Sequence, residues 1–313
     1  MRERVMLSIF VLTYNHEKYI RKALDSVINQ ITDYSYEIII GDDASTDSTP
    51  EILKEHKNLY PDRIKLFQRK KNLGGKGALN LLDLVKKCQG KYVIALEGDD
   101  YWISEYKIDS QIKYLESNPE YIGVAHNCVV VDENSVPNGE KYPECKDNIY
   151  SFKHLGSNIL PGQFTTLMYK NIYMDKKYDF SILEEGLLPA DRLIYFILLS
   201  YGSIFCIQEI LSAYRHITVG GTSFSANISW NYGEAKKWNE ALVRYSRRID
   251  NKNAIKYADL MLMKTIIGSR KRCNNKWNDI FKDLYKSKFA IYRYPQYLHQ
   301  LVNRVFLKKE IWA

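Results

Sequence analysis

The sequence predicts an α/β protein with a mostly parallel sheet flanked by helices, followed by a helical, basic C-terminal extension. Short apolar runs alternate with segments of helical periodicity through the first half of the chain. Acidic clusters follow two of these runs, where a parallel sheet places its ligand. From Trp230 onward the strand pattern stops, and the chain becomes basic and rich in tyrosine.

The first half predicts four strands separated by three helices. We expect strands over residues 6–12, 37–40, 64–67 and 91–96, and helices over 19–28, 50–58 and 79–88. Asn15 is available to cap the first helix. Ser48 or Thr49 is expected to cap the second, which Pro50 opens.

The second half continues the sheet with a weaker pattern. A helix is expected over 105–118 and another over 191–199, with strands over 122–131, 164–169 and 203–208 and a loop-rich stretch over 132–158. We find no internal repeat and no low-complexity linker, so the boundary with the extension near residue 225 is not marked by composition.

The bulk composition is that of a globular protein of 313 residues with a net charge of +8. From Trp230 onward there are 19 basic and 7 acidic side chains, so the basic excess lies in the C-terminal part. The five cysteines form no C-x-x-C pair, which suits a reducing cytoplasm. The N-terminus is read as a first strand, and no apolar run reaches the length of a spanning helix, so we expect any membrane contact to be peripheral.

The stretch Glu97-Gly-Asp-Asp100 places three carboxylates directly behind an apolar run. A divalent cation bound to a diphosphate needs only one or two protein carboxylates, because phosphate oxygens and water complete its octahedral coordination. Glu97 and Asp99 have the alternate spacing for this role, and Gly98 lets the backbone approach a ligand. Asp100 can bond amides or ligand hydroxyls. The alternative is a solvated acidic turn without any ligand.

A second acidic pair, Asp42 and Asp43, follows the second expected strand. A carboxylate there can accept a hydrogen bond from the N3–H of uracil or from a ribose hydroxyl. Thr13, Tyr14 and Asn15 end the first strand and are expected to line the same crevice, with Tyr14 stacking on a flat base. The competing interpretation is a polar loop that only caps the next helix, and for Asn15 a helix cap.

The loop Asn72-Leu-Gly-Gly-Lys-Gly77 can bring Lys76 to a phosphate. A plain surface turn explains it equally well. It has neither the spacing of a P-loop nor that of a dinucleotide fold, which disfavours nucleotide hydrolysis and hydride transfer.

Three segments in this order, Ser8–Asn15, Glu37–Thr49 and Leu96–Trp102, resemble the family 2 glycosyltransferases, which have the GT-A fold. The resemblance implies an inverting, hexosyltransferase-type reaction from a nucleotide-diphosphate donor, usually a UDP-sugar, with Mn²⁺ or Mg²⁺. The expected acceptor is a glycan or lipid-linked glycan in surface polysaccharide synthesis. It also implies a GT-A domain over 1–225, with a nucleotide-binding half over 1–100 and an acceptor-binding half over 101–225, and leaves 226–313 as the basic extension.

Carried over by position, Asp43 resembles the family's uracil-contacting acid, and Asp42 its neighbour near the nucleoside. Asp99 resembles the metal-binding acid of the D-x-D motif. Glu97 stands where the motif has its first aspartate, so its contact with the metal is either direct or through ribose or water.

The segment Leu188–Gly202 resembles the family's helix that carries an acidic general base, and Asp191 is its acid. An inverting displacement needs a carboxylate that takes the proton of the acceptor hydroxyl. A helix cap is the alternative role for Asp191, and Glu184 and Glu185 are the nearest rival acids.

The segment Ala213–Thr222 resembles, imperfectly, a loop that closes over the diphosphate in relatives. It suggests that Arg215 contacts phosphate and that His216 contacts phosphate or the metal, although a structural histidine is equally compatible. Gln163 and Thr165 fall in a segment similar to the acceptor-side wall, where they are expected to meet acceptor hydroxyls. For Tyr101 and Trp102 an acceptor wall and core packing are equally compatible.

The extension contains Ser269–Arg272 and a segment over 294–312 with apolar residues at helical spacing beside lysine and arginine. A basic amphipathic helix can lie on the anionic inner face of the cell membrane, and it can equally pack on the catalytic domain. Nucleic-acid binding is disfavoured because no recognition motif accompanies the charge. The oligomeric state is left open.

Two other functions compete with catalysis of this kind. One is a non-catalytic module with the same fold that binds membrane or a partner through its basic tail. The retained acidic residues argue against this function. The other is a nucleotidyltransferase on a related sheet. Its glycine-rich, basic loop after the first strand is replaced here by Thr13-Tyr-Asn-His16.

Overall fold

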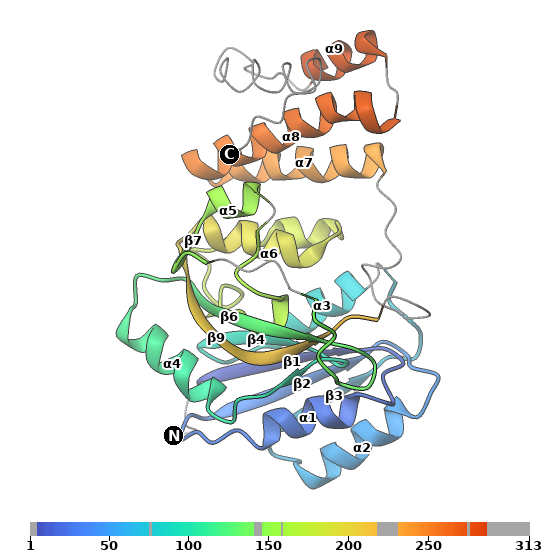
Figure 1. Ribbon diagram of the computed structural model, residues 1–313, viewed down its shortest axis with the longest axis vertical. Coiled ribbons are helices and arrows are strands. Elements are labelled where there is room, and N and C mark those ends of the chain that lie inside the picture. The colour runs from blue at the N-terminus through green and yellow to red at the C-terminus, as the bar shows by residue number, and fades with distance from the viewer. Residues whose placement is uncertain are drawn as a thin grey trace. The chain divides into compact units, whose positions relative to one another are not determined.

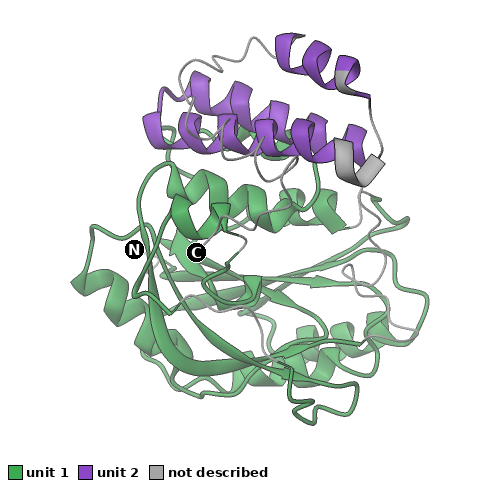
Figure 2. Cartoon of the chain, turned by 45° about the horizontal axis from the view of Figure 1, so that its top comes forward, with its two compact units in different colours: residues 1–227 green, residues 228–313 purple. Residues whose placement is uncertain are grey.

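The computed structural model describes residues 5–74, 77–140, 146–157, 159–217, 231–273 and 276–286. The chain divides into two compact units, residues 1–227 and residues 228–313 (Figure 2). Within the described residues, no helix has both the length and the apolar character needed to cross a membrane.

The first part of unit 1 alternates strands and helices, as the apolar periodicity predicts (Figure 1). The elements are β1 (Leu7–Thr13), α1 (Ile20–Ile28), β2 (Tyr36–Asp42), α2 (Thr49–Leu59), β3 (Ile64–Gln68), α3 (Ala78–Val85) and β4 (Tyr92–Glu97). Strands β3, β2, β1 and β4 are neighbours in this order and pair in parallel.

The second part of unit 1 extends the same sheet with strands of both directions. It contains β5 (Tyr101–Trp102), α4 (Lys107–Ser117), β6 (Gly123–Val131), β7 (Ile149–Tyr150), α5 (Phe152–Gly156), the 3₁₀ turn η2 (Phe164–Thr166), β8 (Met168–Lys170), the 3₁₀ turn η3 (Ser181–Glu185), α6 (Ala190–Leu199) and β9 (Ile204–Arg215). The sheet order is β3-β2-β1-β4-β8-β6-β9-β5, and β7 pairs with β9. The mostly parallel α/β fold predicted from the sequence is confirmed.

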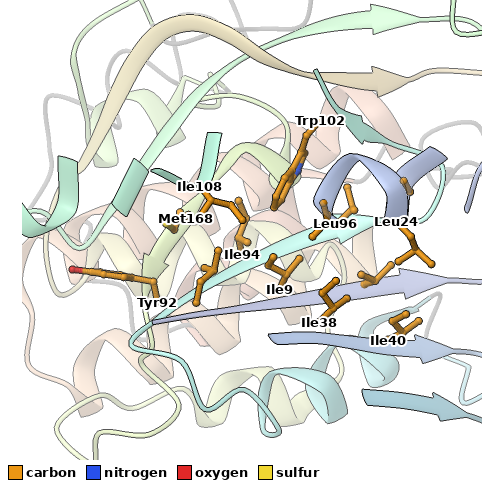
Figure 3. Packing of buried hydrophobic residues seen from close by; sticks show 14 of the residues in the cluster. Ile9, Leu24, Ile38, Ile40, Tyr92, Ile94, Leu96, Trp102, Ile108 and Met168 are labelled. Carbon is orange, nitrogen blue, oxygen red and sulfur yellow. The ribbon is translucent and has the colours of Figure 1, made fainter. Parts of the chain in front are cut away.

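The buried cluster behind the parallel strands explains why these runs form strands (Figure 3). Ile9, Ile94 and Leu96 are fully buried on one face of the sheet, and Leu24 of α1 and Ile108 of α4 are fully buried in the same cluster. Strands covered by helices read as continuous apolar runs, because both faces of the sheet are removed from water. This rigid core fixes the ends of β1, β2 and β4, where the polar residues begin.

Three local predictions differ from the structure, and a side-chain hydrogen bond is involved in each case. Asn15 does not cap α1, because its Oδ1 accepts from the Thr46 N–H. Ser48 occupies the N-cap position of α2 as predicted, but its side chain makes no capping bond, and the Asp47 carboxylate accepts from the Thr49 N–H instead.

The third concerns the strand expected over 164–169. It starts as a 3₁₀ turn because the Gln163 side chain accepts from the Thr165 N–H, and β8 begins only at Met168. The last strand is longer than predicted, because β9 stays paired with β6 as far as Arg215.

Unit 2 is helical over its described residues, with α7 (Tyr232–Arg248), α8 (Lys252–Cys273) and α9 (Trp277–Lys286). Asp283 on α9 accepts from the Tyr232 hydroxyl at 2.6 Å and from Lys236 at 2.7 Å, which joins α9 to α7. The amphipathic segment expected over 294–312 lies outside the described residues.

Candidate active site

The carboxyl ends of three neighbouring strands bring the predicted acids to one edge of the sheet. Strand β1 lies between β2 and β4, with Thr13 opposite Asp42 and Leu12 opposite Glu97. Two acidic clusters that are more than fifty residues apart in sequence therefore flank the end of a single strand.

At the end of β2, the carboxylates of Asp42 and Asp43 are buried and partly bonded. Asp42 Oδ1 accepts from the Ser45 amide and hydroxyl, at 3.1 and 2.5 Å. Asp43 Oδ1 accepts from the Leu73 N–H at 2.7 Å. These bonds to the described residues engage one oxygen of each carboxylate, so both roles considered from the sequence, loop organiser and ligand acceptor, are compatible with the geometry.

The β1–α1 loop presents a more exposed surface. Tyr14 is 39 % exposed, and Asn15 has a positive φ of 55°. The Asn15 side chain is held by Thr46, so it joins two loops, whereas the Tyr14 ring is available to stack on a base. Thr13 is buried beside the acidic turn that follows β4.

Glycine is required at position 98 by close packing. An ideal Cβ at Gly98 would lie 2.7 Å from His16 Nδ1 and 2.8 Å from Thr13 Oγ1. A side chain at this position would require the side chains of His16 and Thr13 to move. The turn after β4 is therefore in contact with the end of β1.

The three carboxylates of the turn differ in their partners. Glu97 is half-buried, and its Oε2 accepts from the Gln163 amide at 3.0 Å. Asp100 is buried, and its Oδ1 accepts from the Arg215 backbone N–H at 2.8 Å. The Asp99 carboxylate makes no hydrogen bond within the described part of the chain, which leaves both of its oxygens for a ligand.

Crowding of these acids changes their protonation. Burial and the charges of Asp99 and Asp191 raise the pKa of Glu97 to about 8. Burial and the charges of Asp99 and Glu97 likewise raise the pKa of Asp100 well above its ordinary range, although Arg215 opposes the shift. Without another cation these two carboxyl groups hold their protons more strongly than isolated acids do, and a cation bound beside them would favour their ionised forms.

Asp191 lies in the first turn of α6, and the structure brings it into electrostatic contact with the turn after β4, since its charge acts on Glu97. It is half-buried, and burial raises its pKa against the opposing charge of Arg192. The residue that precedes the helix is Pro189, and no side-chain cap bond forms. The rival acid Glu184 is exposed and paired with Lys86 at 2.7 Å.

Arg215 occupies a different position from the one expected. Its guanidinium donates to the Asp99 carbonyl and to Ser135 Oγ, each at 2.9 Å, and to the Asp132 carbonyl, and it lies 4.2 Å from the Tyr19 ring centroid. These contacts engage three of its five N–H groups inside the fold. Arg215 therefore holds the acidic turn in place from β9.

His216 does not join the acids in the described part of the structure. His216 Nδ1 lies 2.7 Å from Glu140 Oε2, and its ring is stacked with that of Tyr214. Lys76 lies outside the described residues.

Gln163 and Thr165 also have partners other than those expected. Gln163 bonds Glu97, and the Thr165 hydroxyl lies 2.5 Å from Gln163 Oε1 and 3.4 Å from Asp100 Oδ2. Both residues support the acidic turn, and the sequence offered no signal for this because the contact spans 66 residues.

The donor set suits a divalent cation that keeps other ligands. No group of three or more His, Cys, Asp or Glu side chains in the described residues forms a complete metal site. Asp99 with its open oxygens, beside the crowded carboxylate of Glu97, supplies the one or two oxygen ligands that a cation bound to a diphosphate requires. The residues present therefore fit such an ion.

His16 is a residue that the sequence analysis did not assign. Its ring packs on Gly98, with Nδ1 3.4 Å from Thr13 Oγ1. The signal in the sequence that could have identified it is its position directly after Thr13, Tyr14 and Asn15. The parallel pairing that brings it to Gly98 is visible only in the structure.

Several known proteins are similar to this chain in sequence. An uncharacterised protein of Mycobacterium tuberculosis is 30 % identical over 210 residues, which cover 67 % of this chain and 58 % of that protein. The chain thus spans little more than half the length of this relative. The poly(ribitol-phosphate) beta-N-acetylglucosaminyltransferase TarS of Staphylococcus aureus is 29 % identical over 189 residues, 59 % of this chain and 31 % of TarS.

Solved structures share the fold. The crystal structure of S. aureus TarS 1–349 in complex with UDP-GlcNAc has a TM-score of 0.59 at 17 % identity, covering 85 % of this chain and 73 % of that one. Unit 1 thus has the GT-A type of α/β fold. Residues 8–179, more than half of the chain and including both acidic strand ends, match the profile of glycosyl transferase family 2. The chain belongs to glycosyl transferase family 2.

Proposed function

We propose that the chain is an inverting, cation-dependent glycosyltransferase that moves a sugar from a UDP-sugar to a hydroxyl of a glycan or lipid-linked glycan. The observation that carries the proposal is the group formed by Glu97, Asp99 and Asp191 at the carboxyl edge of the sheet. Family membership and the name of TarS, a relative that transfers N-acetylglucosamine to poly(ribitol-phosphate), support the same reaction class.

The β2 end is proposed to hold the nucleoside. Asp43 and Asp42 each have a carboxylate oxygen that makes no bond to the described residues, and such an oxygen can accept from the uracil N3–H or a ribose hydroxyl. Tyr14 is exposed beside them and stacks on the base. The crystal structures of TarS with UDP and with UDP-GlcNAc motivate the choice of uridine.

The β4 end is proposed to hold the diphosphate through Mn²⁺ or Mg²⁺. Asp99 is the direct ligand in this proposal, and Glu97 contributes charge next to it. A bound cation would offset the negative charge that develops on the leaving diphosphate. Gln163 and Arg215 hold the turn that positions Asp99.

Asp191 is proposed as the general base. Burial raises the pKa of Asp191, and an acid with a raised pKa is a better proton acceptor than an ordinary carboxylate. In the proposed step, the Asp191 carboxylate takes the acceptor's O–H proton as the acceptor oxygen bonds to the anomeric carbon. The bond between that carbon and the diphosphate oxygen breaks, and inversion follows from attack on the opposite face.

The test is donor hydrolysis over a panel of UDP-, GDP- and dTDP-sugars with Mn²⁺, Mg²⁺ or EDTA. We expect slow release of UDP from one UDP-sugar, with loss of release in EDTA and in Asp99→Ala. Asp62→Asn is the matched control, because Asp62 is an exposed acid in the turn between α2 and β3. Release that is unaffected by EDTA and by Asp99→Ala would contradict the cation-dependent site.

A further inference from the structure

The order of the strands determines which residues a bound nucleotide-sugar donor must lie across. Strand β1 separates β2 from β4, as Figure 1 shows, so a ligand that reaches from Asp43 to Asp99 crosses the end of β1. The residues there are Thr13 and the loop that follows it. In the proposed function the nucleoside lies at one side of this crossing and the cation at the other, which puts the phosphates over the β1–α1 loop.

The backbone of this loop has no amide left for a phosphate over three successive residues. The Asn15 N–H donates to Ser45 Oγ at 2.9 Å, the His16 N–H to Thr49 Oγ1 at 2.9 Å, and the Glu17 N–H to Asp47 Oδ2 at 3.0 Å. Loops that cradle phosphates do so with free backbone N–H groups. At these three residues, a contact with a phosphate can therefore come only from a side chain.

The His16 side chain lies where that contact is needed. Its ring packs against Gly98, one residue from Asp99, and Nδ1 faces Thr13 Oγ1. The opposite ring nitrogen, Nε2, has no hydrogen-bond partner among the described residues, and His16 is half-buried at the loop surface. Arg215, a cationic residue beside this turn, is buried, and three of its five N–H groups donate to carbonyl and hydroxyl oxygens.

We propose that His16 binds the diphosphate of the donor, with its Nε2–H donating to a phosphate oxygen. The proposal rests on the proposed function, because the diphosphate spans the two acidic strand ends. Such a donor stabilises the nucleoside diphosphate more as it leaves, since its negative charge grows in that step. Gly98 serves the same purpose by leaving space for the imidazole ring.

Calorimetric titration with UDP and with uridine, both in the presence of Mn²⁺, tests this role. We expect His16→Ala to weaken UDP binding roughly tenfold, the size of one hydrogen bond to a charged group, and to leave uridine binding unchanged. His16→Gln keeps an N–H donor near the position of Nε2 and should stay within about threefold of the wild type. Lys18→Ala, which removes an exposed charge two residues away, is the control and should bind like the wild type.

The outcomes separate the two proposals. UDP affinity that is unchanged in His16→Ala, or an equal loss for UDP and uridine, would overturn the role of His16 alone. If the wild-type protein bound neither UDP nor uridine, the proposed donor class would fail, and this inference would fail with it.

Discussion

Gln163 and Glu97 are joined by a hydrogen bond of 3.0 Å in which the amide of the loop before β8 donates to the carboxylate at the end of β4. The same glutamine accepts from the Thr165 amide at 2.6 Å, so its orientation is fixed from both ends. On the other side, Arg215 holds the turn through Asp99 and Asp100. The acidic turn is thus clamped by two segments from the second half of unit 1.

Removal of the hydrogen bond from Gln163 to Glu97 should impair catalysis, because Glu97 would no longer be held in position. Gln163→Leu leaves the Glu97 carboxylate without its donor, at a cost of about 1–3 kcal/mol for a group of this kind. We expect a kcat at least tenfold lower with a smaller change in the KM for the donor, measured by steady-state UDP release. Gln163→Glu places a second carboxylate against Glu97 and should be worse. Equal kcat in all three proteins would show that the clamp has no part in the reaction.

Asp191→Asn should separate binding from transfer. The amide keeps the shape of the side chain but cannot accept the acceptor's proton, so transfer should fall by about 10²–10⁴-fold while UDP binding persists. Glu184→Gln is the control, because Glu184 is an exposed acid paired with Lys86. If Asp191→Asn kept full transfer activity and Glu184→Gln did not, the assignment of the base would be reversed.

Gly98→Ala should destabilise the protein although it adds a single methyl group. The new Cβ would lie 2.7 Å from His16 Nδ1 and 2.8 Å from Thr13 Oγ1, so these side chains must shift, at a cost of about 1–3 kcal/mol. We expect a lower urea midpoint and weaker UDP binding. Gly268→Ala in α8 is the matched control. Its Cβ meets nothing within 4 Å, and a gain of about 0.5–1 kcal/mol is expected there. Equal stability of Gly98→Ala and the wild type would contradict the packing described for His16.

Lys107 gives unit 1 a pH-dependent stability. It is fully buried, its Nζ donates to Gln111 at 2.6 Å, and burial lowers its pKa well below the usual range. Between that lowered pKa and about 10.4, the unfolded chain binds a proton that the folded chain does not, so the free energy of unfolding falls as the pH falls. Lys107→Met should remove this slope and raise the urea midpoint at pH 7.

The control is Lys113→Met on the same helix, whose side chain is 68 % exposed and should leave the slope unchanged. The pKa of His126 is also lowered well below its usual range, by burial and by the charge of Lys107, so part of the acid sensitivity should remain. Parallel urea midpoints for the wild type and Lys107→Met between pH 6 and 9 would contradict the account.

The sequence was sufficient to predict the parallel half of the sheet and the acidic residues at its edge. The runs that became β1, β2 and β4 are continuous and apolar, and polar residues end each of them, which are local signals. Asp191 was also identified from a local pattern, a helix start with an acid, together with the family resemblance. Its electrostatic contact with Glu97 is a result of the structure.

The contacts of Gln163, Arg215 and His16 could not be predicted from local sequence patterns. Glu97 is 66 residues from Gln163, and Asp99 and Asp100 are more than 100 residues from Arg215. Contacts of this kind depend on register and packing that no periodicity encodes. Asn15 shows the converse error. A residue suited to cap a helix instead joins two loops, because Thr46 competes for its oxygen.

The most direct test of the central claim is the melting temperature of the wild type and of Asp99→Ala, each with and without UDP and Mn²⁺. The charge of Asp99 helps to raise the pKa of Glu97, so Asp99→Ala should melt no lower than the wild type without ligand. We predict that UDP with Mn²⁺ raises the wild-type melting temperature by several degrees and that Asp99→Ala shows no such rise. An unchanged wild-type melting temperature, or an equal rise in Asp99→Ala, would contradict a cation-bound nucleotide diphosphate at the end of β4.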